Sequence, residues 1–266
     1  MASKRTGAVG IEYVSPEGLR LDGRRPGEIR RLRAAVGVEP AYDGSATFQM
    51  GNTLVVATVR GPAEGVGSGS SASATSGASG GAARVFCDYE QAPFSTKERR
   101  RRPRDRATTE LGATIARVLE GVVQLQAYPP RACVHVCVRV VQNDGGARAC
   151  ALNAAVLACV DAGVPLADVV CACGAGVIDG TPVLDTSAAE EAAGGADVAL
   201  ALLARTGRVA MLETDARLPA DVFRAAVALA STGTQLVYTQ MCTVLRTAAA
   251  EALAARGSVA PKFSDL

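Results

Sequence analysis

The stretch that decides the fold is residues 134–163, VHVCVRVVQNDGGARACALNAAVLACVDAG. Valine at every second position from Val134 to Val140 predicts a strand with one apolar face. A turn follows at Asp144-Gly145-Gly146, and an alanine-rich run at residues 147–162 predicts a buried helix closed by Gly163. A strand, a glycine turn and a buried helix in this order favour a layered protein with both α and β elements.

The rest of the chain repeats this order of strands and then helices. Residues 46–50 and 53–60 predict a hairpin through Gly51-Asn52. Further strands are predicted at residues 32–38, 84–89 and 169–177, and a second hairpin at 199–203 and 209–213. Helices are predicted at residues 108–123 and 220–255, the second with a break near Gly233. Residues 1–16 read as a flexible tail, and the Gly/Ser/Ala-rich residues 63–83 as a low-complexity loop.

Composition limits the core and the environment. Hydrophobic residues make up 48% of the 266 residues, yet aromatics only 4%, so Ala, Val, Leu and Cys must build the core. The eight cysteines lie in apolar runs, which predicts reduced, buried thiols. Neither a secretory signal nor a membrane-spanning run is recognisable, so we expect an intracellular protein with no membrane contact.

Charge is concentrated in one place. The chain carries 28 basic and 26 acidic residues, and 25 of the basic residues are arginine. Seven basic residues lie within ten positions: Lys97, Arg99, Arg100, Arg101, Arg102, Arg104 and Arg106. Such a run is usually a solvated loop. Its density, and its place between an aromatic strand end and a helix, favour contact with a nucleic-acid backbone.

The turn at residues 144–148 is a candidate anion site. A helix start exposes unpaired N–H groups at the positive end of the helix dipole. Gly145 and Gly146 would let an anion approach the backbone, and Arg148 could add a charged fork. The turn fits neither a Walker A loop nor a dinucleotide-binding motif. On local sequence alone, a tight turn with a solvated Arg148 is the stronger interpretation.

A second candidate is acidic. Asp185 and Glu191 lie six residues apart in an expected loop, where carboxylates could bind Mg²⁺ or act as acid and base. The alternative, an ordinary acidic turn before a helix, is stronger on local evidence. The single histidine, His135, lies mid-strand, which excludes most Ser-His-Asp and Cys-His schemes.

Cys133, His135 and Cys137 alternate along one strand and suggest zinc. Residues two apart in a strand are separated by roughly 6.5–7 Å, whereas zinc ligand atoms lie about 2.0–2.3 Å from the metal. One straight strand therefore supplies a poor three-ligand set, and we expect these side chains to pack in the core.

Taken together, several segments resemble the RNase PH family in order and spacing. Within it they look most like the RNA exosome ring subunit that carries the phosphorolytic site in archaea. The matching segments are LDGRR at 21–25, DGSA at 43–46, GNT at 51–53, FS at 94–95, ERRR at 98–101, QNDGG at 142–146, NAA at 153–155, DAGVP at 161–165 and EEAAGG at 190–195.

The resemblance implies an α+β RNase PH fold with two pseudo-symmetric β-α layers in a single domain at residues 17–246, followed by a C-terminal extension at 247–266. It implies a hetero-hexameric ring with other RNase PH-like exosome subunits and S1/KH-type cap proteins. RNA would pass through the central channel towards an associated hydrolytic nuclease. Such a protein would lie in the nucleus, nucleolus and cytoplasm.

Site residues follow from the same resemblance. Gly146, Ala147 and Arg148 match the phosphate-binding turn. Asp185 and Glu191 match the catalytic carboxylates, with Asp185 a tentative Mg²⁺ ligand. The basic residues that match the RNA path are Arg99, Arg100, Arg101, Arg102 and Arg106. An active member would use inorganic phosphate as co-substrate together with Mg²⁺, and an inactive one no cofactor.

Three positions depart from the pattern of active relatives. They usually have Ser or Thr where Ala147 stands, often a basic residue where Ala107 stands, and commonly Asp where Glu191 stands. Losing one neutral hydrogen bond costs about 0.5–1.5 kcal/mol.

Two functions therefore stay open. The first is a mainly structural ring subunit that binds RNA for 3′-to-5′ processing, turnover and rRNA maturation. The second is a phosphate-dependent 3′–5′ exoribonuclease that releases nucleoside diphosphates. Arg106, Arg148 and Asp185 favour the enzyme, whereas Ala147 and Glu191 favour the structural subunit, towards which we lean. A bacterial-type homohexamer that trims tRNA is a third option, which the segments at 21–25 and 190–195 disfavour.

Overall fold

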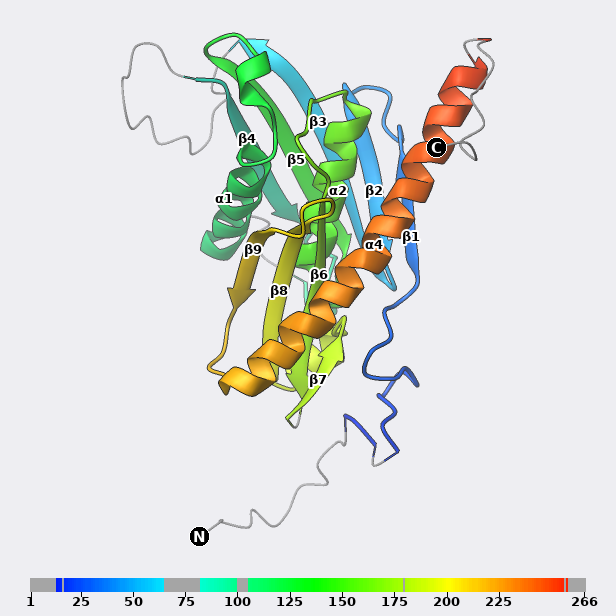
Figure 1. Ribbon diagram of the computed structural model, residues 1–266, viewed down its shortest axis with the longest axis vertical. Helices are drawn as coiled ribbons and strands as arrows, with labels where there is room; N and C mark the ends of the chain where they lie inside the picture. Colours follow the sequence, from blue (N-terminus) through cyan, green and yellow to red (C-terminus); the bar gives the residue numbers. More distant parts are fainter. Residues whose placement is uncertain are drawn as a thin grey trace.

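The computed structural model describes residues 13–15, 17–64, 82–99, 105–178, 180–255 and 257. Its strands form two sheets (Figure 1). The five-stranded sheet has the order β1-β2-β3-β5-β4, with β1 Leu32–Val36, β2 Gly44–Met50, β3 Thr53–Glu64, β4 Arg84–Gln91 and β5 Ala132–Gln142. The four-stranded sheet has the order β7-β6-β8-β9, with β6 Val170–Ile178, β7 Thr181–Leu184, β8 Ala196–Leu203 and β9 Val209–Thr214.

Strand direction in the first sheet decides which residues meet. The expected hairpin is confirmed, because β2 and β3 are antiparallel and Met50 lies opposite Thr53 across Gly51-Asn52. Strands β4 and β5 run parallel, with Gln91 opposite Val140. Both therefore finish at the same edge of the sheet. The segments that follow them, beginning with Ala92 and Asn143, leave the sheet side by side.

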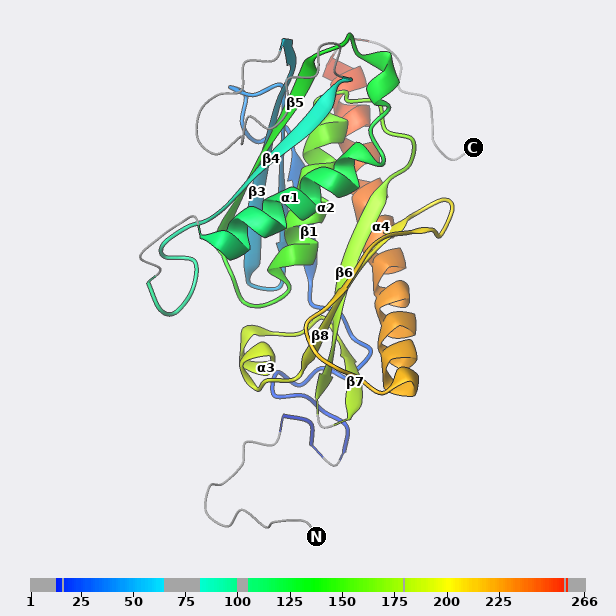
Figure 2. The same ribbon diagram turned by 90° about the vertical axis from the view of Figure 1, so that its left-hand side faces the viewer.

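Four α-helices and one short 3₁₀ helix complete the fold: α1 Arg106–Glu120, η1 Leu125–Ala127, α2 Ala147–Asp161, α3 Ala188–Ala192 and α4 Ala220–Ala255. Helix α2 lies between the two sheets and is buried along nearly its whole length (Figure 2). An apolar surface on every side is the pattern expected of such a helix. Helix α1 packs on β4, and α4 crosses β6, β7 and β8 and reaches β1. The two β-α layers confirm the expected α+β fold.

One buried amide attaches α2 to the second sheet. Asn153 is fully buried; its Nδ2 donates to the Ala172 carbonyl at 2.9 Å, and its Oδ1 accepts from the Ala172 N–H at 2.8 Å. Both polar ends of the side chain are thus satisfied where solvent is excluded. The asparagine therefore fixes the position of α2, and with it the turn before α2, against β6.

Two expectations about the second half are wrong. Helix α4 is unbroken at Gly233, because this glycine permits close packing: a Cβ there would lie 2.6 Å from Cys173 Sγ. The segment expected as an acidic loop contains β7, which pairs with β6 from Leu184 to Thr181, and the one-turn helix α3. The expected boundary after residue 246 falls inside α4.

The expected core packing of Cys133, His135 and Cys137 is also wrong. The valines between them face the core, so the three side chains lie on the opposite, helix-free face of the sheet. Cys137 is exposed, and His135 stacks on Phe86 with ring centroids 5.3 Å apart. Among the described residues, no group of three His, Cys, Asp or Glu side chains could hold a metal ion.

Buried thiols are found elsewhere: Cys150, Cys159, Cys171 and Cys173 are all buried. Burial raises the pKa of Cys150 and Cys159 to about 12, so neither is a thiolate near neutral pH. Most of the expected tail at 1–16 and of the loop at 63–83 lies outside the described residues. Within the described part of the chain, no helix is long and apolar enough to cross a membrane.

Candidate RNA and phosphate site

The glycine turn before α2 is held by the hairpin β2–β3. Thr53 Oγ1 donates to the Gly145 carbonyl at 2.7 Å and accepts from the Asp144 N–H at 3.0 Å. Asn52 Nδ2 donates to Asp144 Oδ2 at 3.0 Å. The hairpin signal Gly51-Asn52-Thr53 therefore has a second role, because its residues fix the backbone from which α2 starts.

Gly145 is required by protein packing more than by a ligand. Its φ is +87°, and a Cβ on it would lie 2.4 Å from the Thr186 carbonyl oxygen. Gly146, with φ +67°, is the N-cap of α2; a Cβ there would lie 3.1 Å from Arg30 Nη2 and 3.4 Å from Asp185 Oδ1. The two glycines thus bring the segment around Asp185 against the start of α2.

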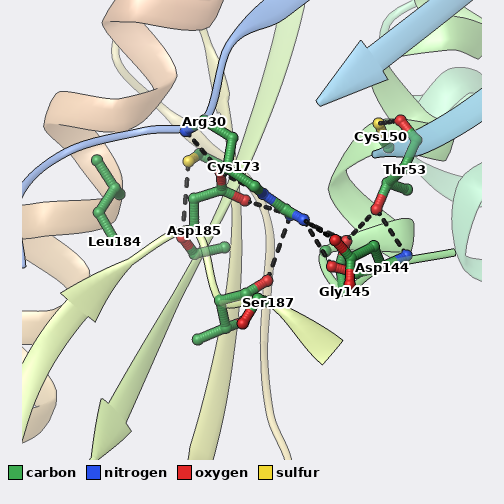
Figure 3. A network of polar contacts seen from close by, with 12 residues as sticks. Arg30, Thr53, Asp144, Gly145, Cys150, Cys173, Leu184, Asp185 and Ser187 are labelled. Atoms are coloured by element: carbon green, nitrogen blue, oxygen red, sulfur yellow. Dashed lines mark hydrogen bonds and ion pairs between the residues drawn. The ribbon is translucent and has the colours of Figure 1, made fainter. Parts of the chain in front are cut away.

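Arg30 binds both carboxylate oxygens of Asp185 (Figure 3). Arg30 Nε and Nη2 donate to the two carboxylate oxygens at 2.8 and 2.7 Å, and the Arg30 N–H donates at 2.9 Å. The same guanidinium donates to the carbonyls of Asp144 and Gly145 at 2.6 and 3.0 Å. Burial disfavours the charged guanidinium, but Asp185 outweighs it and raises the pKa of Arg30.

This arrangement does not fit Mg²⁺ at Asp185. The carboxylate is 1% exposed, and the positive guanidinium of Arg30 already occupies both of its oxygens. Arg24 adds a second cation 3.5 Å from Oδ2. A divalent cation needs free oxygen ligands and would be repelled by these two charges. Asp185 therefore holds the N-terminal segment of the chain to the second sheet.

A parallel pair lies next to it. Arg20 donates from Nε to Glu190 Oε1 at 2.7 Å and from Nη2 to the Asp185 carbonyl at 2.9 Å. Both partners of the Arg20–Glu190 pair are buried. Burial works to raise the pKa of Glu190, but the bonds from Arg20 and Ser187 prevail and lower it. The pair keeps α3, and so Glu191, in place.

Glu191 points in the opposite direction from Glu190, towards the start of α2. Its Oε1 accepts from the Gly146 N–H at 2.8 Å, so a carboxylate lies where the sequence predicted an anion. Loss of surrounding water raises the pKa of Glu191, opposed by the Gly146 N–H and by the charges of Arg30 and Arg148. The next N–H groups of the helix, at Ala147 and Arg148, have no acceptor in the described part of the chain.

Arg148 is available beside this helix end. Its side chain is 41% exposed and forms an ion pair with Glu213 of β9 at 3.8 Å. Asp197 of β8 lies near enough to feel the charges of Glu191 and Arg148. Burial, helped by Glu191, raises the pKa of Asp197 to about 6. No local sequence pattern marks Asp197, because the charged groups that surround it lie on other elements.

The described ends of the basic segment follow β4 and begin α1. Arg99 is exposed and follows β4, while Arg106 begins α1, is 93% exposed and pairs with Glu110 at 2.8 Å. Arg100, Arg101 and Arg102 lie outside the described residues. The structure therefore brings Gly146, Ala147 and Arg148 together with Glu191. Asp185 lies against Gly146 but is buried among three arginines that no sequence pattern selected: Arg20, Arg24 and Arg30.

Comparison with known proteins identifies the family. Residues 28–165 match the model of domain 1 of the 3′ exoribonuclease family, RNase PH, and residues 168–250 match its domain 2. "Exosome complex component RRP41 homolog" of Arabidopsis thaliana is 42% identical over 236 residues, 89% of this chain and 95% of that protein. "Exosome complex component RRP41" of Mus musculus is 43% identical over 249 residues, 93% of this chain and 99% of that protein.

Solved structures agree. The crystal structure of rice (Oryza sativa) Rrp46 has a TM-score of 0.71 and 26% identity, covering 85% of this chain and 100% of that chain. The Archaeoglobus fulgidus exosome, solved with RNA bound to the active site, shares the fold with a TM-score of 0.70, 19% identity and coverage of 84% and 93%. The two matched domains cover nearly all of the described residues, and the chain belongs to the RNase PH family of 3′ exoribonucleases.

Proposed function

We propose that this chain is a core ring subunit of an RNA exosome and takes part in 3′-to-5′ RNA processing and degradation. Relatives 42–43% identical, matched over about nine tenths of this chain and nearly their whole length, are named exosome components. In this proposal its neighbours are other RNase PH-like subunits, S1/KH-type cap proteins and a hydrolytic nuclease. We further propose that it lies in the nucleus, nucleolus and cytoplasm.

One observation carries the RNA contact. Strands β4 and β5 are parallel and end at the same edge, so Lys97 and Arg99 after β4 lie on the same side of the sheet as the start of α2 after β5. Exposed arginines supply sequence-independent attraction to phosphates. A helix start supplies N–H donors for one phosphate. A single edge of the first sheet thus offers both means of binding an RNA backbone.

The same edge favours a mainly structural role. Glu191 already accepts the Gly146 N–H, so a phosphate must displace a carboxylate before it binds there. Asp185 is enclosed by arginine and has no free oxygen to hold a metal or transfer a proton. Both carboxylates that the family resemblance marks as catalytic are engaged within the protein.

Arg148 supports a second candidate, phosphorolysis. Its exposed guanidinium lies beside the N–H groups of Ala147 and Arg148, which have no acceptor among the described residues. A phosphate bound there could attack the terminal phosphodiester of RNA. A new P–O bond would form as the bond to the preceding 3′ oxygen breaks, releasing a nucleoside diphosphate and a shortened RNA.

The test uses the reconstituted ring and end-labelled RNA. We expect RNA binding that weakens steeply with salt, and no nucleoside diphosphate with or without phosphate. Phosphate-dependent diphosphate that disappears with Arg148→Ala, but not with the exposed Arg139→Ala, would establish the second candidate. Asp185→Ala is unsuitable, because it leaves Arg30 buried without its partner. A chain that enters no ring and binds no RNA would overturn both.

A further inference from the structure

Phe94 is the most exposed of the large apolar side chains in the described residues. Its side chain is 72% exposed, although Ala92 and Ser95 on either side are 5% and 4% exposed. Isolated apolar residues on a surface are ordinary. A phenyl ring exposed between buried Ala92 and Ser95 is different, because hydrogen bonds hold the backbone that carries it.

The backbone that carries Phe94 is fixed by three hydrogen bonds. The Ala92 N–H donates to the Val140 carbonyl at 3.0 Å, which extends the β4–β5 ladder by one residue. The Ser95 N–H donates to the Ala92 carbonyl at 3.0 Å and closes a turn. The Asn143 N–H donates to the Ser95 carbonyl at 2.8 Å. The ring is therefore presented on a preorganised turn.

This turn lies next to the start of α2. Asn143, which binds the Ser95 carbonyl, also accepts the Gly145 N–H on its Oδ1 at 3.1 Å. Gly146 lies three positions after Asn143, a path of at most about 11 Å. On the other side, Lys97 and Arg99 follow within five residues and are both exposed. An exposed aromatic ring thus stands between N–H donors for an anion and basic side chains.

We propose that Phe94 binds a base of RNA by stacking, while Lys97, Arg99 and the α2 start hold the adjoining RNA backbone. The inference rests on the proposed RNA-binding function and adds a residue that contacts the base. Proteins that bind single-stranded nucleic acid combine positive charges along the backbone with aromatic side chains on which the bases stack. Every base has a flat π face, so the contact suits a protein that must accept RNA of any sequence.

The experiment measures RNA affinity of the reconstituted ring with Phe94→Ala and Phe94→Trp. Alanine should weaken binding by about 5- to 150-fold, the range of a lost stacked base, and tryptophan should preserve it. The matched control is Val38→Ala, which removes an exposed apolar side chain (43% exposed) beyond the opposite end of the first sheet. That variant should bind RNA as the native ring does.

A second probe separates base from backbone. With RNA whose 3′-terminal nucleotides are replaced by abasic ribose, the native and Phe94→Ala rings should bind with equal affinity. Arg99→Ala should instead lower the affinity for the intact and the abasic RNA alike. Equal loss on both RNAs with Phe94→Ala, or no loss on either, would overturn the stacking role. Failure of Phe94→Ala to enter the ring would instead assign Phe94 to a subunit contact. A native ring that binds neither RNA would overturn the proposed function itself.

Discussion

Asp185 and Glu191 come from one short segment, six residues apart, and meet opposite fates. The Asp185 carboxylate is 1% exposed and bound by Arg30 through both oxygens. Glu191 is exposed and reaches the Gly146 N–H through one oxygen. A buried charge must keep its partner, whereas an exposed one can exchange it for another ion. The first carboxylate therefore holds the protein together, and only the second can give way to a ligand.

The strongest test of the buried side is Arg30→Ala. It leaves Asp185 charged and buried without its main partner, which typically costs about 3–5 kcal/mol. We expect a loss of that size in the free energy of unfolding, measured by urea denaturation. Arg148→Ala is the control, because Arg148 is 41% exposed and should cost little. Equal stability of the two variants would contradict the structural role of Asp185.

The close approach of the two regions can be tested at Gly145. Gly145→Ala combines left-handed strain with a Cβ 2.4 Å from the Thr186 oxygen. Gly163→Ala is a matched control, since its φ is +72° and its Cβ would meet nothing within 4 Å. In the control, the free energy of unfolding should fall by about 1–2 kcal/mol from strain alone. Gly145→Ala should lower it by clearly more, and thermal unfolding measures both. A similar loss in both would mean that the turn relaxes freely.

A third carboxylate, Asp197, makes the stability of the protein depend on pH. Its pKa in the folded chain, about 6, lies above the ordinary 3.8, so folding favours the neutral acid. The contribution of Asp197 to stability is therefore fully present below about pH 4 and is lost as the pH rises through about 6. Asp197→Asn should raise the free energy of unfolding at pH 8 by at most about 3 kcal/mol.

The pH profile of the same variant supplies the control. Its advantage over the native chain should disappear at about pH 3, below the ordinary pKa of 3.8, because Asp197 is then largely protonated in both the folded and the unfolded native chain. An advantage that persists at this pH would have another origin, such as altered packing.

The smallest effect on stability is expected at the exposed carboxylate, Glu191. Glu191→Gln should change the free energy of unfolding by less than about 1 kcal/mol, as exposed ion contacts generally do. It should nevertheless increase the thermal stabilisation by added phosphate, because a neutral amide competes less for the Gly146 N–H. Glu251→Gln, a second exposed substitution near the end of α4, should leave the response to phosphate unchanged. Equal stabilisation by phosphate in the native chain and both variants would show that Glu191 does not compete with phosphate for the α2 start.

Local signals were sufficient for much of the fold. Gly51-Asn52 predicted the hairpin, and the alternating valines before Gly145 predicted β5, because each depends on neighbours within a few residues. The alternation did not tell which side of β5 was solvent, so the positions of His135 and Cys137 were wrong. Gly233 looked like a helix break because its packing partner, Cys173, lies 60 residues earlier in the chain.

The candidate site shows the same limit. The family resemblance selected Arg148, Asp185 and Glu191. The residues near them in the sequence did not predict that Arg30, 155 residues from Asp185, would bind its carboxylate. No local pattern marks Arg30 among 25 arginines. The role of each carboxylate is set by which distant segment arrives beside it, which only the three-dimensional structure provides.

The buried arginine cluster also sets an order for events at the ribosome. Arg20 and Arg30 are made early, whereas Glu190 and Asp185 follow 170 and 155 residues later. At about 5–20 residues per second, Arg30 waits roughly 8–30 s for its carboxylate. A guanidinium is costly to bury unpaired, so the segment that carries Arg20 and Arg30 stays in solvent during that time. This N-terminal segment therefore docks last, after the second half of the chain has supplied its carboxylates.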